Sequence, residues 1–256
     1  MAKTYANGRP LHFVFIPGPD GSRSKPGKFH PDEADWRFRH IILEAVHLFG
    51  ATFEVRDNRN VLINGDVFPV GYRPDAPVFN YQINGVVGMN RPMLGPKPSK
   101  KAMHYVEEYL NGRDPISVTL RWSRYEKRNS TLDAWTEFAK GKDVVFVPDT
   151  DTAFMTWPFD VFTQAAVNMD IRLALYASCR TNCFTSNGPS ALCWFNDYPY
   201  LLFKAGGEPY ITKEQWDELK VPYGTQPSFI RPNQKWVWEP DTIDVIRREV
   251  DGWSPR

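Results

Sequence analysis

The stretch MDIRLALYASCRTNCFTSNGPSALCWFNDYPYLLF, residues 169–203, alternates between helical and strand-like patterns. Residues 170–179 have helical apolar spacing, and NCFT at 182–185 is typical of a short strand. GPSALCWF then opens a second helical run, and YLLF at 200–203 is again an apolar strand. Strands that alternate with helices form parallel sheets in α/β proteins. The stretch therefore predicts part of a parallel sheet covered by helices.

The same alternation continues on the N-terminal side of this stretch. ISVTLRW at residues 116–122 and DVVFVP at residues 143–148 are expected strands. TLDAWTEFAKG at residues 131–141 is an expected helix that stops at Gly141. Helices are also expected over residues 159–167 and 242–250. The second half of the chain thus predicts one doubly wound α/β domain.

The first half carries a shorter version of this pattern. Residues 11–16 and 52–55 are expected strands on either side of a helix over residues 32–49. NVLINGDVF at residues 60–68 suggests a hairpin, and residues 99–110 suggest a helix. A break at Asn111 and Gly112 follows that helix. We therefore predict two α/β domains, residues 1–113 and 114–256.

Composition and charge restrict the possible partners. Of the 256 residues, 42% are hydrophobic, which is enough to fill sizeable cores. The 31 Lys and Arg balance 30 Asp and Glu, so no overall field attracts nucleic acid or an acidic membrane. The sequence has no apolar run of about 18 residues and no signal-peptide pattern at its start. We expect a cytoplasmic protein without a transmembrane segment.

Three cysteines lie close together in the sequence, at Cys179, Cys183 and Cys193. Their odd number does not suit a disulfide framework, and no C-x-x-C pair or nearby histidine indicates zinc. A free cysteine behaves as a small apolar residue. The three thiols are therefore expected to be buried.

A small polar segment precedes the helical run at residues 188–195. It consists of Ser186, Asn187, Gly188, Pro189 and Ser190. A helix start has unpaired N–H groups and a partial positive charge, so it can hold a phosphate if the residues there are small. The alternative is that Ser186 or Asn187 only caps the helix, with Pro189 in its first turn. Both interpretations are open at this point.

The order of elements over residues 116–204 resembles the nucleotide-sugar-binding domain of GT-B glycosyltransferases, above all the ADP-heptose lipopolysaccharide heptosyltransferase type. That family has a helix, a short strand, a D-S-G-P-x-H turn and a closing strand. Here Asn187, Gly188, Pro189 and Ser190 occupy the turn. The aspartate of the family is replaced by Ser186 or Asn187, and its histidine by Ala191.

The resemblance implies an α/β fold of two Rossmann-like lobes (GT-B-like), of which the N-terminal lobe is reduced. Residues 1–113 would form the acceptor-side lobe, and residues 114–256 the nucleotide-sugar-binding lobe with a C-terminal tail helix. It also implies that the donor is a nucleotide-diphosphate sugar, bound without an obligatory metal or other cofactor. The D-T-D at residues 149–151 is accordingly not expected to hold a metal.

A cluster of cations follows the expected strand at 116–122. The segment TLRWSRYEKRNST contains Arg121, Arg124, Lys127 and Arg128, followed by Asn129 and Ser130. In the resembled domain this loop helps to neutralise the donor diphosphate, and arginine forks suit paired phosphate oxygens. The alternative is a solvated charge cluster. Because the carboxyl ends of parallel strands share one edge, this loop is expected to face the Ser186 segment.

Carboxylates provide further candidates. Asp149 ends a strand, where it could accept a hydrogen bond from a ribose or base, or simply cap a turn. An inverting sugar transfer needs a base that takes the proton of the acceptor hydroxyl. In the resembled enzymes this base is a carboxylate of the N-terminal domain, which makes Asp20 the first candidate and His30 the second. Asp20 could also be an ordinary turn residue.

The sequence thus predicts a glycosyltransferase that moves a sugar from a nucleotide-diphosphate sugar to an acceptor hydroxyl on a glycan or other polymer. An alternative is a non-catalytic nucleotide- or sugar-binding module on the same fold. A third possibility is another nucleotide-dependent enzyme on a doubly wound sheet. Neither G-x-G-x-x-G nor G-x-x-x-x-G-K-[ST] occurs, which argues against dinucleotide oxidoreductases and P-loop kinases.

Overall fold

A computed structural model describes residues 6–16, 31–57, 94–123, 126–206, 212–218 and 221–254. The chain divides into two compact units, Met1–Pro96 and Lys97–Arg256. The hairpin expected at residues 60–68 lies outside the described residues. The sequence placed the boundary near residue 113, but helix α5 (Lys100–Leu110) packs against helix α8 (Met169–Ser178) in the second unit.

The first unit contains the expected strand–helix–strand arrangement. Strand β1 (His12–Phe15) pairs in parallel with β2 (Thr52–Val55). The connection is helical but is not one regular helix, because a π-helical segment, Phe38–Ile42, separates α2 (Pro31–Arg37) from α3 (Leu43–Leu48). The ring of Phe38 meets Phe15 of β1 edge-on at 5.0 Å. The helical segment is therefore packed against the two-stranded sheet.

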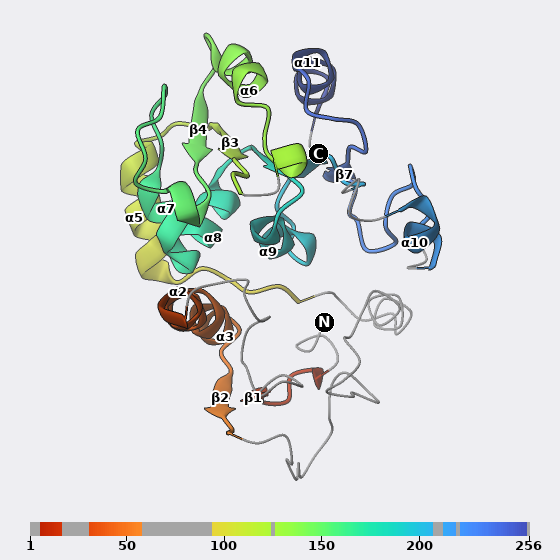
Figure 1. Ribbon diagram of the computed structural model, residues 1–256. Helices are drawn as coiled ribbons and strands as arrows, with labels where there is room; N and C mark the ends of the chain where they lie inside the picture. Colours follow the sequence, from red (N-terminus) through yellow and green to blue (C-terminus); the bar gives the residue numbers. More distant parts are fainter. Residues whose placement is uncertain are drawn as a thin grey trace. The chain divides into compact units, whose positions relative to one another are not determined.

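The second unit is built on a five-stranded parallel sheet with the order β4-β3-β5-β6-β7 (Figure 1). The strands are β3 (Ile116–Thr119), β4 (Val144–Val147), β5 (Thr181–Thr185), β6 (Tyr200–Phe203) and β7 (Gln234–Trp236). The helices besides α5 and α8 are α6 (Leu132–Ala139), α7 (Thr163–Val167), α9 (Ala191–Trp194), α10 (Lys213–Glu218) and α11 (Ile243–Asp251). Short 3-10 turns occur at η2 (Glu126–Arg128), η3 (Thr150–Thr152) and η4 (Gly188–Ser190).

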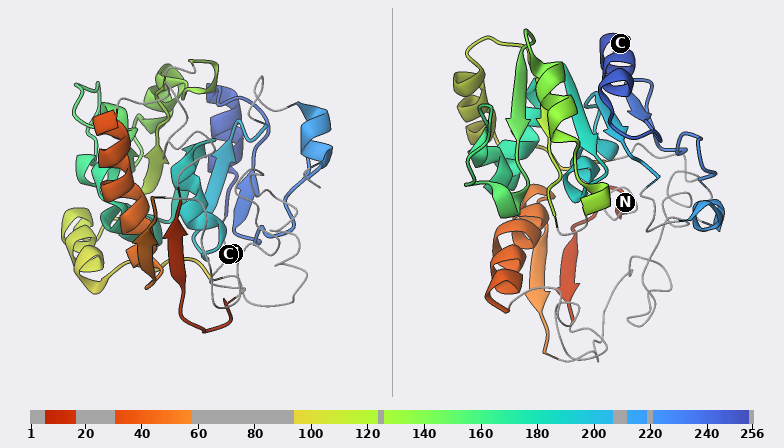
Figure 2. Two further views of the ribbon diagram at one scale, coloured as in Figure 1. Left: turned by 60° about the horizontal axis from the view of Figure 1, so that its bottom comes forward. Right: turned by 45° about the horizontal axis from the view of Figure 1, so that its top comes forward.

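Helices cover both faces of this sheet (Figure 2). On one face, Val118 of β3 and Phe203 of β6 pack with Trp135 of α6 and Ile246 of α11. On the other face, Val145 and Val147 of β4 pack with α5, α7 and α8. In β4, Phe146 thus enters the first cluster and its neighbours Val145 and Val147 enter the second, as the two-residue period of a strand requires. The predicted doubly wound α/β domain is confirmed at this level.

The strand order places the switch point of the sheet between β3 and β5. The chain passes from β3 to β4 on one side, then returns to add β5, β6 and β7 on the other side. The connections therefore diverge above the carboxyl ends of β3 and β5. In open α/β sheets, ligands bind in the crevice at this position.

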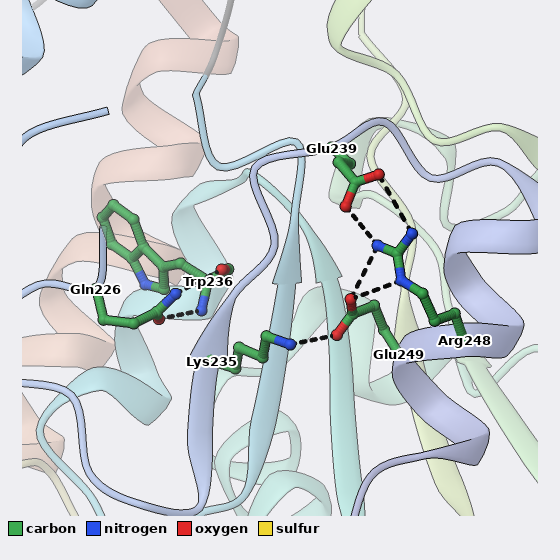
Figure 3. Close-up of polar contacts among 6 residues, drawn as sticks. All are labelled: Gln226, Lys235, Trp236, Glu239, Arg248 and Glu249. Carbon is green, nitrogen blue, oxygen red and sulfur yellow. Dashed lines mark hydrogen bonds and ion pairs between the residues drawn. The ribbon is translucent and has the colours of Figure 1, made fainter. Parts of the chain in front are cut away.

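Strand β7 is the last strand of the sheet among the described residues, and side chains hold its outer side (Figure 3). Gln226 accepts a hydrogen bond from the Trp236 amide at 2.8 Å and donates one to its carbonyl oxygen at 2.9 Å. Lys235 forms an ion pair with Glu249 of α11 at 2.6 Å, and Arg248 joins Glu249 to Glu239. The Gln226 side chain thus satisfies the outward backbone groups of Trp236, and the ion pairs tie α11 to the sheet.

Two further expectations concern the whole chain. The three cysteines are free and buried, which confirms the prediction. Among the described residues, no helix combines the length and apolar character needed to cross a membrane.

Candidate functional site

A pocket of about 280 Å³ lies at the carboxyl ends of the strands in the second unit. Three cationic residues line one part of it, namely Lys127, Arg128 and Lys204. The remaining lining consists of Ser186, Gly206, Tyr223, Trp238 and Pro240. No carboxylate occurs among the described residues that line the pocket. Its composition therefore favours an anionic ligand that also has an apolar or aromatic part.

The cation-bearing loop after β3 is fastened to the neighbouring strand β5. The backbone N–H of Arg121 donates to Ser130 Oγ at 2.8 Å, and this hydroxyl donates to Thr185 Oγ1 at 2.8 Å. Within the loop, the Asn129 side chain bonds both the N–H and the carbonyl of Ser123 at 2.8 Å. Asn129 and Ser130 therefore shape the loop, while Lys127 and Arg128 line the pocket.

Below this loop lies the carboxylate of Asp241, which is fully buried. It accepts hydrogen bonds from Thr131 N–H (2.9 Å), Thr131 Oγ1 (2.8 Å), Trp135 Nε1 (2.8 Å) and Thr185 Oγ1 (3.3 Å). Lys204 Nζ lies 2.7 Å from Asp241 Oδ1. The donors come from the loop after β3, from α6 and from the ends of β5 and β6. Asp241 thus links four segments of the second unit, among them the pocket residue Lys204.

Lys204 directly follows β6 and has an unusual backbone conformation. Its φ of 52° lies in the left-handed region that non-glycine residues rarely occupy. Its ammonium group donates to the Asn129 carbonyl at 2.6 Å in addition to its ion pair with Asp241. These two contacts fix the charge at the pocket wall. They also offset the cost of the backbone conformation, since such strain persists only where surrounding contacts hold it.

The Ser186 segment meets the cation-bearing loop, as its place in the sequence suggests. Arg121 Nη1 donates to the Ser186 carbonyl at 2.7 Å, and Arg128 Nη2 approaches the same oxygen at 3.4 Å. This carbonyl points the two guanidinium groups toward the end of β5. The structure therefore brings together Arg121, Arg128 and Ser186.

The turn that follows Ser186 caps a short helix. Asn187 Oδ1 accepts from the Ser190 N–H at 3.2 Å, and Ser190 Oγ donates to the Asn187 carbonyl at 2.7 Å. The N–H of Ala191 is also bonded within the turn, so few backbone donors remain to hold a phosphate. A Cβ placed on Gly188 would meet no atom within 4 Å, and Pro189 occupies the first turn. Side-chain cations are thus better placed than this helix start to bind an anion.

Asp149 lies at the end of β4 and is not among the pocket residues. Its Oδ2 accepts from the Trp122 N–H at 3.3 Å, and its carbonyl accepts from the N–H of Thr152 at 3.0 Å. This geometry is that of a turn residue, one of the two interpretations that the sequence left open. Asp20, His30 and Arg124 lie outside the described residues.

Six residues of the site were not found from the sequence. Five line the pocket, namely Lys204, Gly206, Tyr223, Trp238 and Pro240, and the sixth is Asp241, which pairs with Lys204. Lys204 carried the clearest signal, because it directly follows the strand YLLF. Trp238 follows β7, a strand too short to recognise from its pattern. Tyr223 and Asp241 lie in irregular segments, and only the tertiary fold brings Tyr223 to the pocket and Asp241 to Lys204.

Comparisons with known proteins add no relative: no family model, no curated protein and no solved structure matches this chain. Among the described residues there is also no group of three or more His, Cys, Asp or Glu side chains that could hold a metal ion. A functional assignment therefore rests on the chemistry of the pocket.

Proposed function

We propose that this protein is a glycosyltransferase that moves a sugar from a nucleotide-diphosphate sugar to an acceptor hydroxyl. The observation that carries the proposal is the cationic pocket at the carboxyl ends of the parallel strands, next to the β3–β5 switch point. The second unit would bind the donor. The acceptor would be bound by the first unit, Met1–Pro96.

The charges of the pocket suit a diphosphate. Lys127 is exposed and Arg128 is half-buried, so one cation is accessible and the other is shielded from water. A guanidinium group can donate two parallel hydrogen bonds to phosphate oxygens, and an ammonium acts as a point charge. Preorganised cations stabilise the negative charge that develops on a leaving group. Lys127 and Arg128 could stabilise the departing diphosphate in this way, so the proposal requires no metal.

One observation favours the alternative of a non-catalytic binding module. The aspartate of the resembled family is replaced here by Ser186 or Asn187 and its histidine by Ala191, so neither the carboxylate nor the imidazole is present at these positions. Such a module would bind the same nucleotide sugars without turning them over. Binding and turnover must therefore be measured separately.

The proposal is tested by a thermal-shift series with nucleotide sugars, followed by transfer and hydrolysis assays with those that bind. A ligand that binds only the folded protein raises its melting temperature by mass action. We expect nucleotide sugars to raise it and sugar to be released or transferred. Binding without turnover would favour the binding module. Absence of both binding and turnover would refute both functions.

A second test concerns the catalytic base, for which the family resemblance makes Asp20 the first candidate. Asp20→Asn removes the proton acceptor but keeps the size of the side chain. If Asp20 is the general base, turnover should fall by about 100-fold or more while the affinity for the nucleotide stays unchanged. Unchanged turnover would instead direct attention to His30.

A further inference from the structure

Besides its cations, the pocket has two aromatic lining residues, Tyr223 and Trp238. We call their two rings the aromatic wall. Their centroids are 4.6 Å apart, with an interplanar angle of 52°. Both side chains are half-buried, so each has a covered part and an accessible part. They belong to the second unit but lie beyond residue 204, outside the segment that resembles a known family.

Neighbouring groups of the second unit contact both rings of the aromatic wall. Trp238 Nε1 donates to the Thr225 carbonyl at 2.9 Å, and its ring meets that of Trp216 edge-on at 5.3 Å. Lys213 Nζ lies 5.0 Å from the centre of the Tyr223 ring. Rings that are fixed before binding lose little conformational freedom when a ligand arrives. Because the two rings are inclined at 52°, a flat partner can stack on one of them while its edge lies against the other.

A glycine permits the close packing of Tyr223. Gly206 has no side chain, and a Cβ built there would come within 2.8 Å of Tyr223 Cε2. Its carbonyl accepts a hydrogen bond from Trp216 Nε1 at 2.8 Å, which fixes the backbone at this position. Gly206 therefore sets how far the Tyr223 ring extends along the pocket.

Two kinds of ring could lie against this wall, a nucleobase or a sugar. A sugar has a hydroxyl on most of its carbons and needs several polar partners. The wall and its neighbours Gly206 and Pro240 offer a single side-chain hydroxyl, that of Tyr223. A nucleobase has a flat π face, which stacks on aromatic rings regardless of its identity. The wall therefore favours a base.

We infer that Tyr223 and Trp238 bind the nucleobase of a nucleotide whose phosphates contact Lys127 and Arg128. This inference rests on the proposed function and adds to it the way in which the ligand lies in the pocket. If the base binds by stacking, the site should accept both purines and pyrimidines, because every base has a flat π face. The phosphates and the base are then recognised by different segments of the second unit.

The test compares ligands with and without a base by calorimetry. ADP, UDP, inorganic pyrophosphate and glucose 1-phosphate are titrated into the wild type and into Trp238→Leu. We expect the affinities for ADP and UDP to fall by about 5- to 100-fold, the range typical of one stacked base. The affinity for pyrophosphate should not change. Trp122→Leu is the control, because Trp122 is 38% exposed and lies outside the pocket.

Tyr223→Leu serves as a second variant and should act in the same direction as Trp238→Leu. The inference is overturned if these changes leave the affinities for ADP and UDP as in the wild type, or if they weaken pyrophosphate equally. It is also overturned if glucose 1-phosphate alone loses affinity, since the wall would then bind the sugar. In these cases the cationic site and the proposed function can still stand. If no nucleotide binds at all, both this inference and the proposed function are refuted.

Discussion

The carboxylate of Asp241 accepts hydrogen bonds from residues that are up to 110 positions away in the sequence. Its Oδ2 receives Thr131 N–H and Trp135 Nε1–H, while its Oδ1 faces Lys204. Since the carboxylate is fully buried, its charge depends on these partners. At the scale of single residues, Asp241 is therefore the residue that most directly holds the cation-bearing loop in place.

We predict that Asp241→Asn lowers the free energy of unfolding by about 2–5 kcal/mol. An asparagine has one acceptor oxygen, so its NH2 group would face donors, and Lys204 would lose its counter-ion. Urea denaturation measures the change. Asp251→Asn removes a carboxylate from an exposed ion pair with Lys142 and should cost no more than about 1 kcal/mol. Equal effects of the two variants would contradict the role given to Asp241.

The three buried cysteines provide another residue-scale prediction. Burial raises the pKa of the Cys183 and Cys193 thiols, and burial is also the main cause of the raised pKa of Cys179. The thiolate is the reactive form, so none of the three should react in the native protein. Mass spectrometry after iodoacetamide treatment at pH 8 should show no adduct in the folded protein and three after denaturation. Rapid modification of the native protein would contradict the burial.

At the scale of elements, α11 is tied to the edge strand β7 through Glu249. Burial raises the pKa of this carboxyl, but hydrogen bonds from Lys235 and Arg248 outweigh that effect, and its pKa is lowered overall (Figure 3). A carboxyl whose pKa is lower in the folded state stabilises the fold above its unfolded pKa. This contribution is lost as the pH falls through the folded pKa.

We therefore predict that Glu249→Gln lowers the free energy of unfolding at pH 7 by about 1.5–3 kcal/mol. The difference from the wild type should shrink as the pH falls from about 5 to below the ordinary glutamate value of about 4.3. Denaturation at several pH values measures it. Glu239→Gln is the matched control, because Glu239 is more exposed than Glu249 and pairs with the same arginine. If the difference in unfolding free energy between the wild type and Glu249→Gln does not change with pH, the lowered pKa of Glu249 does not contribute to stability.

The elements also show what the sequence could reveal and what it could not. The strands of the β3 to β6 region were predictable, since runs such as VVFV and YLLF are apolar and lie between helical patterns. Strand β7 was missed because QKW is short and carries a charge. It becomes a strand through its pairing with β6, and Lys235 is tolerated because Glu249 neutralises it.

The candidate site was predictable to the same limited extent. Lys127, Arg128 and Ser186 follow recognisable strands, so the shared edge of a parallel sheet placed them together. Tyr223, Trp238 and Asp241 follow no recognisable pattern, and they reach the site through the path of the chain after β6. The sequence thus indicates the cationic part of the pocket, whereas the aromatic wall emerges only from the tertiary structure.

At the scale of the whole molecule, the described part of the pocket belongs to the second unit. All of its described lining residues lie within Lys97–Arg256, and the strand order puts them at the carboxyl edge of one sheet. Donor binding is therefore expected to be a property of the second unit. The central claim is that this pocket binds a diphosphate through its cations.

Calorimetric titration of a nucleoside diphosphate and of its parent nucleoside, each into the wild type and Lys127→Ala, tests that claim most directly. Lys127 is exposed, so its removal should leave the fold intact, and Lys140→Ala, at the exposed residue that follows α6, is the matched control. We predict that the diphosphate binds at least about tenfold more tightly than the nucleoside. We also predict that Lys127→Ala weakens the diphosphate by about 3- to 10-fold and leaves the nucleoside unchanged. Equal affinities for the two ligands, unaffected by Lys127→Ala, would contradict the claim.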